Sequence, residues 1–207
     1  MRTTVYFTTL LSLILLSTSL WAGLNEDLFK AVKKGDIKTV AALIKKGANV
    51  NAKDDWKRSP LYTASGKGYL AIVKLLIRKG ADVNLKNEFD GTALHEACQE
   101  GHSKIVNVLL EKGADVNAIT RARKRTPLHR VMDRKENKER IKIVKALLAK
   151  GAKVSLRTRN NGLMLTPFHF TAARGSIEFA KLLLANGADI NTRVKTYQKE
   201  RVRWDQM

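Results

Sequence analysis

One five-residue phrase recurs along this 207-residue chain and limits its fold more than any other feature. The phrase reads Gly-Ala-x-Val/Ile-Asn/Ser, and its copies begin 33, 33, 38 and 36 residues apart, at Gly47, Gly80, Gly113, Gly151 and Gly187. A unit of about 33 residues is too small to bury its own apolar face, so such units stack and stabilise one another. The repeat therefore predicts an elongated stack whose surface carries the function.

Each phrase follows a segment with the apolar spacing of one buried helix face. In the third unit this segment comprises Ile105, Val106, Val108, Leu109 and Leu110. The glycine that comes next stands where a helix commonly ends in a left-handed conformation, which glycine adopts at the lowest cost. Each glycine of the repeat is therefore expected to end a helix.

A second phrase marks the start of an earlier helix in each full unit. It begins at Ser59, Thr126 and Thr166 as Ser/Thr-Pro-Leu/Phe-Tyr/His, and Thr92-Ala93-Leu94-His95 is its fourth variant. A Ser or Thr hydroxyl can cap the free amides of a helix N-terminus, and proline at the next position has no amide hydrogen to lose. The predicted unit is a helix, a turn, a second helix and an extended connector.

This unit resembles the ankyrin repeat, which has a period of about 33 residues and the phrase Thr-Pro-Leu-His-x-Ala. The resemblance covers residues 24–191. It implies an all-α fold, an ankyrin-type α-solenoid of about five stacked helix-turn-helix units with projecting β-hairpin loops. The first unit lacks the Thr-Pro phrase and is interpreted as an N-terminal cap. The expected units are about 24–50, 51–83, 84–116, 117–154 and 155–190, followed by a basic C-terminal tail at 192–207.

Two units depart from the regular pattern. Thr126 precedes Gly151 by 25 residues instead of 21, so the fourth unit has four extra residues near the charged segment 134–140. This insertion is interpreted as an extended helix end or solvated loop, or alternatively as a contact with a partner. The fifth connector contains Asn160-Asn161-Gly162, which is typical of a tight hairpin turn.

Residues 1–22 have the layout of a secretory signal peptide. Arg2 precedes an apolar run that is densest at 10–16, and small residues follow at Ser17, Ser19 and Ala22. A spanning helix needs about 20 predominantly apolar residues, and the Thr and Ser content of this segment argues against one. We therefore expect export to the periplasm or the extracellular space, with cleavage after Ser19 or Ala22. An uncleaved membrane anchor is the alternative.

The sequence offers no motif for catalysis. It contains no Gly-rich phosphate loop, no Gly-x-Ser-x-Gly and no His-Glu-x-x-His. His95, His129 and His169 occupy the fourth position of the helix-start phrase, where the resemblance implies local hydrogen bonds that order adjacent loops. Cys98 is the only cysteine, so no internal disulfide can form, and its small position predicts burial. We expect a monomeric, non-catalytic protein without a metal, a cofactor or a small-molecule substrate.

The formal net charge of +20 is open to several interpretations. It fits a surface of solvated lysines, an acidic protein partner, an anionic membrane or cell-wall polymer, or nucleic acid. The resemblance places the binding surface in a concave groove lined by first-helix positions and connector tips. At these helix positions seven residues are basic and three are acidic, and the middle unit alone has an acidic balance, so basic and acidic units alternate along the groove. The candidate partner-binding residues are Lys30, Lys33, Lys34, Lys67, Glu96, Glu100, Arg130, Arg134, Phe170 and Arg174 on helices, and Trp56, Arg58, Phe89, Arg121 and Arg123 on connectors.

Aromatic residues and arginine contribute most of the energy of protein interfaces. Exposed Trp56, Phe89 and Phe170 are therefore predicted to anchor a partner, although Trp56 and Phe89 could instead fold back on their own hairpins. The first hypothesis is a module for protein–protein interaction that binds a partner through the groove and hairpin tips. The alternative is a polyanion binder, whose affinity would fall steeply with salt.

Overall fold

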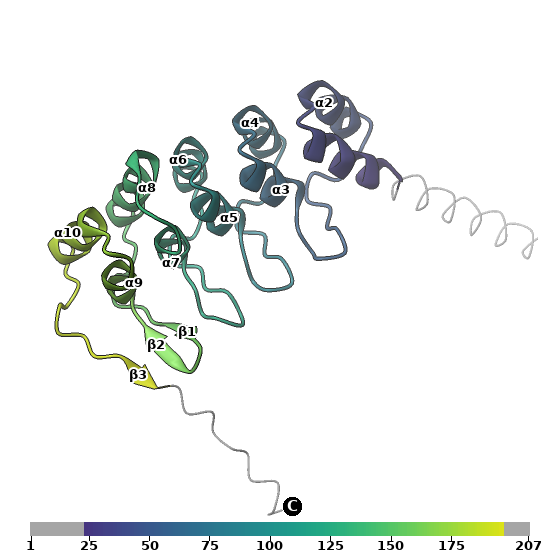
Figure 1. The fold of residues 1–207 in the computed structure, drawn as a ribbon. Helices are drawn as coiled ribbons and strands as arrows, with labels where there is room; N and C mark the ends of the chain where they lie inside the picture. Colours follow the sequence, from purple (N-terminus) through teal and green to yellow (C-terminus); the bar gives the residue numbers. More distant parts are fainter. Residues whose placement is uncertain (1–22, 197–207) are drawn as a thin grey trace, which may run out of the picture.

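The structure is a computed structural model that describes residues 23–196, and Figure 1 shows them as a curved stack of helix pairs. The first pair consists of a helix that includes residues 23–34 and α2 (Ile37–Lys45). The later pairs are α3 (Pro60–Lys67) with α4 (Leu70–Arg78), α5 (Ala93–Glu100) with α6 (Ser103–Glu111), α7 (Pro127–Met132) with α8 (Lys138–Ala149), and α9 (Pro167–Arg174) with α10 (Ile177–Ala185). The predicted α-solenoid is confirmed.

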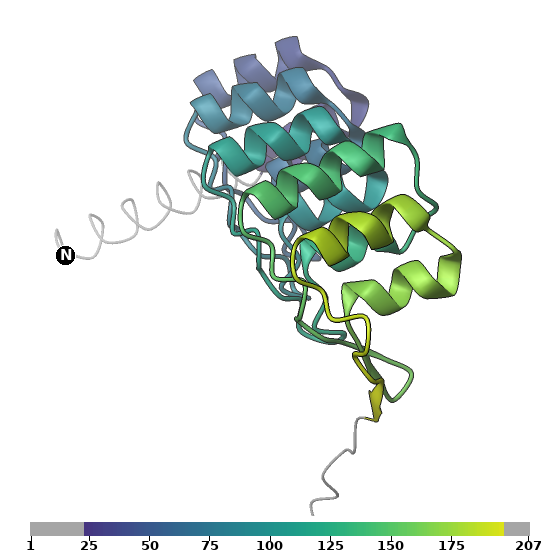
Figure 2. The same cartoon turned by 90° about the vertical axis from the view of Figure 1, so that its left-hand side faces the viewer.

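The helices form two layers that share one continuous core. The first helices of successive units pack on one another, as do the second helices, and the two helices of each unit pack together (Figures 1 and 2). Leu94 and Leu128 of the first layer and Leu109 and Leu147 of the second are completely buried. In Figure 1 the first helices and the connectors lie on the concave side of the stack. Residues at these positions can therefore share one surface.

The helix-start phrase caps the first helices as its sequence predicts. The Ser59 hydroxyl accepts a hydrogen bond from the Tyr62 amide at 3.0 Å. In the third unit, Nδ1 of His95 accepts from the Thr92 amide at 3.2 Å, so Nε2 carries the ring proton and donates to the Arg125 carbonyl at 3.1 Å. The histidine therefore ties its own helix start to the next connector, as the resemblance implies.

Two glycines between paired helices meet both a backbone and a packing requirement. Gly68 and Gly101 have φ angles of +78° and +86°. A Cβ atom on Gly68 would lie 2.7 Å from Cε1 of His102, and one on Gly101 would lie 3.3 Å from a guanidinium nitrogen of Arg140. A side chain from the following unit thus covers each glycine, which links neighbouring units.

The asparagine of the repeated phrase joins successive connectors. The Asn84 amide nitrogen donates to the Gly113 carbonyl at 3.0 Å, and its oxygen accepts from the Asp115 amide at 2.8 Å. Asn51 and Asn117 make the same pair of bonds to their following units. The next phrase has Ser155 at this position, and no corresponding pair of bonds is present there in residues 23–196. These repeated asparagine bonds form a ladder along the connectors, and the junction between the last two units lacks one pair of them.

The last connector forms a small antiparallel sheet. β1 (Thr158–Asn160) pairs with β2 (Leu163–Leu165), and Asn161 and Gly162 make the predicted turn with φ angles of +47° and +80°. β3 (Lys195–Thr196) adds to the free edge of β2. The segment assigned to a tail from residue 192 therefore begins by extending this hairpin.

The insertion in the fourth unit is partly an extended helix end, because α8 has 12 residues whereas α4 and α6 have 9, and its remaining residues only partly match a solvated loop. Residues 134–139 are exposed or half-buried, but Arg140 is buried and its guanidinium donates to the Gln99 carbonyl at 2.7 Å, at the end of α5. Glu136 accepts a 3.4 Å hydrogen bond from the Phe179 amide in α10. The insertion thus links its unit to both neighbours, because its charged side chains reach free backbone groups at helix ends.

Candidate functional site

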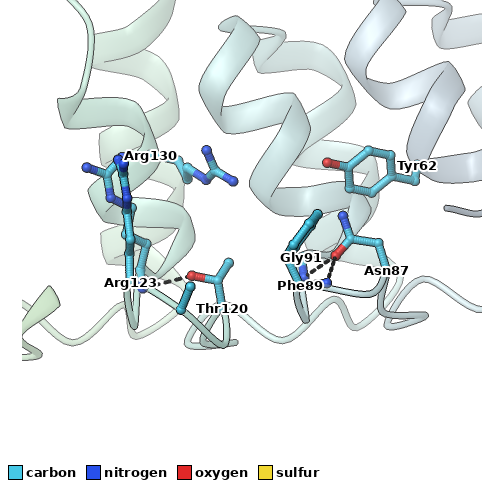
Figure 3. A pocket seen from close by; sticks show the side chains of 9 residues that line it. Tyr62, Asn87, Phe89, Gly91, Thr120, Arg123 and Arg130 are labelled. Atoms are coloured by element: carbon cyan, nitrogen blue, oxygen red, sulfur yellow. Dashed lines mark hydrogen bonds between the residues drawn. The ribbon is translucent and has the colours of Figure 1, made fainter. Parts of the chain in front are cut away.

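Two adjoining hollows lie on the concave side between the second, third and fourth units. The arginine pocket, about 250 Å³ in volume, is lined by Tyr62, Phe89 and the guanidinium-bearing Arg123, Arg125 and Arg130. Figure 3 shows Arg123 and Arg130 on one side of it and Tyr62 and Asn87 on the other. The glutamate pocket, about 290 Å³, is lined by Tyr62, Arg58, Lys67, Glu96 and Glu100. Tyr62 is the wall that both pockets share.

Local hydrogen bonds hold the connector walls of the arginine pocket. The side-chain oxygen of Asn87 accepts from the Phe89 amide at 2.9 Å and from the Gly91 amide at 2.8 Å. The Phe89 carbonyl accepts from the Arg121 amide of the next connector, also at 2.9 Å. Phe89 nevertheless leaves 52 % of its surface exposed. An apolar ring is therefore held at the mouth of the pocket without being covered by the chain.

The arginine pocket is strongly electropositive. Its lining contains no carboxylate among the described residues, and Asp133 accepts a hydrogen bond from Arg125, one of its three arginines. Burial lowers the pKa of Arg125; Asp133 opposes this shift, whereas Arg123 and Arg130 add to it. Three arginines thus line a pocket that has no carboxylate in its own wall.

The glutamate pocket has mixed charge. The Tyr62 hydroxyl donates to a carboxylate oxygen of Glu96 at 2.7 Å. Burial raises the pKa of Tyr62, and the charge of Glu96 raises it further. Arg58 is held on its own connector by Asp54, with nitrogen–oxygen distances of 2.8 and 2.7 Å. Lys67 and Glu100 are exposed at the pocket's edge. Acidic groups therefore stand directly beside the arginine pocket.

The prediction that Phe170 is an exposed anchor in the groove is wrong. It is only 7 % exposed, because its position on α9 faces α7 instead of the groove. Its ring meets the His129 ring edge-on, with centroids 5.9 Å apart, and the Arg125 guanidinium carbon lies 5.8 Å from its centroid. Phe170 therefore supports the floor below the pocket and is not available as an anchor.

The other candidate aromatics stay accessible. Trp56 is 55 % exposed and Phe89 is 52 % exposed, so neither is folded back under its own connector. The Trp56 carbonyl accepts from the Glu88 amide at 3.1 Å, so these two connectors are joined. The Phe89 carbonyl and the Arg121 amide join the next two connectors in the same way. The two rings thus project from a row of mutually bonded loops.

The structure separates the predicted basic residues into groups. Arg123 and Arg130 meet Phe89 in the arginine pocket, whereas Lys67 and Arg58 meet the two glutamates. The remaining candidates, which lie outside both pockets, are Lys30, Lys33, Lys34, Arg121, Arg134 and Arg174. Of these, Lys30 pairs with Glu26 at 2.8 Å and Arg121 pairs with Asp90 at 3.1 Å. The predicted groove is therefore not uniformly basic.

Sequence reasoning missed two members of the site, Tyr62 and Arg125. A signal for Tyr62 was present, because it replaces the histidine found at the fourth position of the helix-start phrase in other units. Arg125 belongs to the basic run at 121–125, but only the fold shows that it is buried while residues 121–124 are exposed.

The buried histidines and the cysteine have structural positions. Burial lowers the pKa of both His95 and His129 to about 4, so these rings are neutral at pH 7. Cys98 is completely buried, as expected, and burial raises the pKa of its thiol. Residues 23–196 contain no group of three or more His, Cys, Asp or Glu that could hold a metal ion. Nor does any helix in that range have the length and apolar character required to cross a bilayer.

The fold and the groove define a class of protein, the repeat solenoid that presents a concave surface to its ligands. The family model of ankyrin repeats (3 copies) matches residues 28–120 and 118–194. The chain therefore belongs to the ankyrin repeat family. Comparison with curated proteins finds no match. Ankyrin repeats generally mediate protein–protein interaction and are generally non-catalytic.

Proposed function

We propose that this protein is a non-catalytic binding module whose concave groove and connector tips hold another protein. The observation that carries this proposal is the exposure of Phe89 beside the arginine pocket. Aromatic and arginine side chains that meet in a pocket are typical of the few residues that dominate the energy of an interface. Because hydrogen bonds already hold this connector, binding would cost little ordering entropy.

The mixed charge of the groove favours a protein over a polyanion as the ligand. Glu96 and Glu100 adjoin the arginine pocket, so a ligand with uniformly spaced negative charges would be repelled there. A folded protein or a peptide can match both signs. Part of the net charge lies on the outer helices, where Lys38, Lys74 and Lys104 are exposed.

We further propose that the protein is exported to the periplasm or the extracellular space. Support comes from the charge of Arg2, the apolar run at 10–16 and the small residues that end at Ala22. This segment lies outside the described residues. Sequencing the N-terminus of protein from its native host should give a start near Leu20 or Gly23. An intact Met1 on cytosolic material would contradict export, and an intact Met1 in the membrane fraction would support the uncleaved anchor.

Site-specific photocrosslinking tests the binding proposal. A photoreactive amino acid at Phe89 in the groove is compared with the same amino acid at Lys74, which is exposed on α4 of the outer layer. Expression in the native host followed by irradiation should give a discrete protein adduct from position 89 only. Equal adducts from both positions, or nucleic acid as the only adduct at position 89, would refute a protein-binding groove.

A further inference from the structure

The arginine pocket has hydrogen-bonding capacity that the described chain leaves unused. A guanidinium group has five N–H donors. One terminal nitrogen of Arg125 donates a hydrogen bond to Asp133, and one terminal nitrogen of Arg130 donates to the Gln99 side chain. The Nε atoms of both residues are buried and have no hydrogen-bond partner within residues 23–196. Unsatisfied buried donors are costly, so an acceptor that reaches them through a small shift of these side chains would be favoured.

Arg123 supplies the accessible part of the pocket. It is exposed, and its backbone is fixed because its carbonyl accepts from the Arg159 amide at 2.7 Å and from the Thr158 hydroxyl at 2.5 Å. Arg123 therefore lines the open side of the pocket, while Arg125 is 8 % exposed and lines its buried side. A planar acceptor that entered between them would meet donors from more than one guanidinium group.

The size of the pocket limits what can enter. Its volume of about 250 Å³ is below the range of about 300–1,000 Å³ that is typical of cofactor and small-molecule sites. This space suits one or two side chains of an extended peptide. Phe89 at the mouth offers an apolar contact next to the charged one. Glu96 and Glu100 on the other side of Tyr62 disfavour a second negative charge close to the first.

From this arrangement we infer that the arginine pocket is a subsite for a single carboxylate side chain of a partner protein. An Asp or Glu enters beside Arg123, Arg125 and Arg130, an adjacent apolar residue packs on Phe89, and a neutral or basic residue faces the glutamate pocket. This inference rests on the proposed protein-binding function and specifies the chemistry of the partner segment.

The probe is a phage-displayed library of random peptides, selected on the full-length chain. Sequences with one Asp or Glu beside an apolar residue should be enriched. The best peptide is then synthesised twice, with its acid and with the matching amide, and the affinities are measured by isothermal titration calorimetry. On the native protein the amide peptide should bind about 10- to 100-fold more weakly, which is the expected effect of losing hydrogen bonds between charged groups.

A double-mutant cycle identifies the pocket as the site of the carboxylate. The variant Arg123→Gln, Arg130→Gln should bind the acid and the amide peptide with equal affinity. The matched control Lys74→Gln, Lys104→Gln removes the same charge from the outer layer and should retain the full preference for the acid. Circular dichroism confirms that each variant is folded, and Arg123→Gln alone replaces the double variant if that protein unfolds.

Each outcome bears on a separate claim. Enriched peptides without an acid, or a preference for the acid that survives in the Arg123, Arg130 variant, would overturn the carboxylate subsite and leave the binding function intact. No enrichment on the native protein would overturn the subsite for a peptide carboxylate, and photocrosslinking at position 89 would then decide the binding function separately. Oligothymidylate serves as a polyanion probe. If the native chain binds it, and the pocket variant and the outer-layer control weaken this binding equally, the ligand is held by delocalised charge. That result would also overturn the subsite.

Discussion

Arg140 offers the sharpest test of how this stack is held together. It is a buried cation that belongs to the fourth unit but reaches the third, where its guanidinium lies 2.7 Å from the Gln99 carbonyl and 3.4 Å from the Cys98 carbonyl. It also contacts the Val131 carbonyl at 3.5 Å. We predict that Arg140→Met destabilises the protein by about 1–3 kcal/mol.

The magnitude follows from opposing contributions. The short bond to Gln99 is charge-assisted and contributes about 1.5–3 kcal/mol, and the two longer contacts contribute little. A cation at the C-terminus of α5 adds about 0.3–1 kcal/mol through the helix dipole. Burial lowers the pKa of Arg140, which reflects the cost of removing water from its charge and offsets part of this gain. Methionine preserves most of the aliphatic volume, so a cavity contributes little.

Urea unfolding followed by circular dichroism measures the effect. Lys145→Met is the matched control, because Lys145 is exposed on the same helix and should change the free energy of unfolding by less than about 0.5 kcal/mol. An Arg140→Met variant as stable as the native protein, or more stable, would refute the reasoning. That result would mean that dehydration of the guanidinium costs more than its carbonyl contacts return.

Three further predictions concern the same interfaces. Because burial lowers the pKa of His95 and His129 to about 4, the unfolded state binds more protons below about pH 6.5, and stability should fall as the pH drops towards 4, by about 3 kcal/mol per histidine at pH 4. The double variant His95→Gln, His129→Gln should flatten that profile in urea titrations, and an unchanged slope would contradict the assignment. Asn84→Ala should cost about 1–3 kcal/mol, since the Gly113 carbonyl and the Asp115 amide lose their partner. Ser155→Asn should raise the thermal midpoint by supplying the missing link to the last unit, and a lowered midpoint would count against the ladder.

Much of this fold could be predicted from local chemistry. Three signals act within a few residues: a glycine that ends a helix, a hydroxyl that caps its start, and an apolar stripe between them. Because their range is short, they can be read directly from the sequence. The same is true of the turn at Asn161-Gly162, where both residues adopt the positive φ that their types tolerate. Burial of Cys98 was expected from the small position that it occupies in the ankyrin-like phrase, and the structure confirms it.

The candidate site was predictable only in part, because its parts come from different units. Phe89 and Arg123 were identifiable as connector residues, but their meeting with Arg130 depends on how three units stack. Phe170 shows the converse: its position along α9 suggested the groove, but its ring packs against His129 and Arg125 of the preceding unit and is buried there.

The sequence by itself determined the repeating unit, because helix starts, helix ends and buried faces are set by neighbours within a turn or two of the chain. Only the tertiary structure decided which charged side chains stabilise the contacts between units and which remain accessible to a ligand. Arg140 and Arg123 are the same residue type, yet one is buried against carbonyls of the preceding unit and the other stands at the rim of an open pocket. That difference arises from contacts between residues far apart in the chain, and short-range sequence patterns do not encode it.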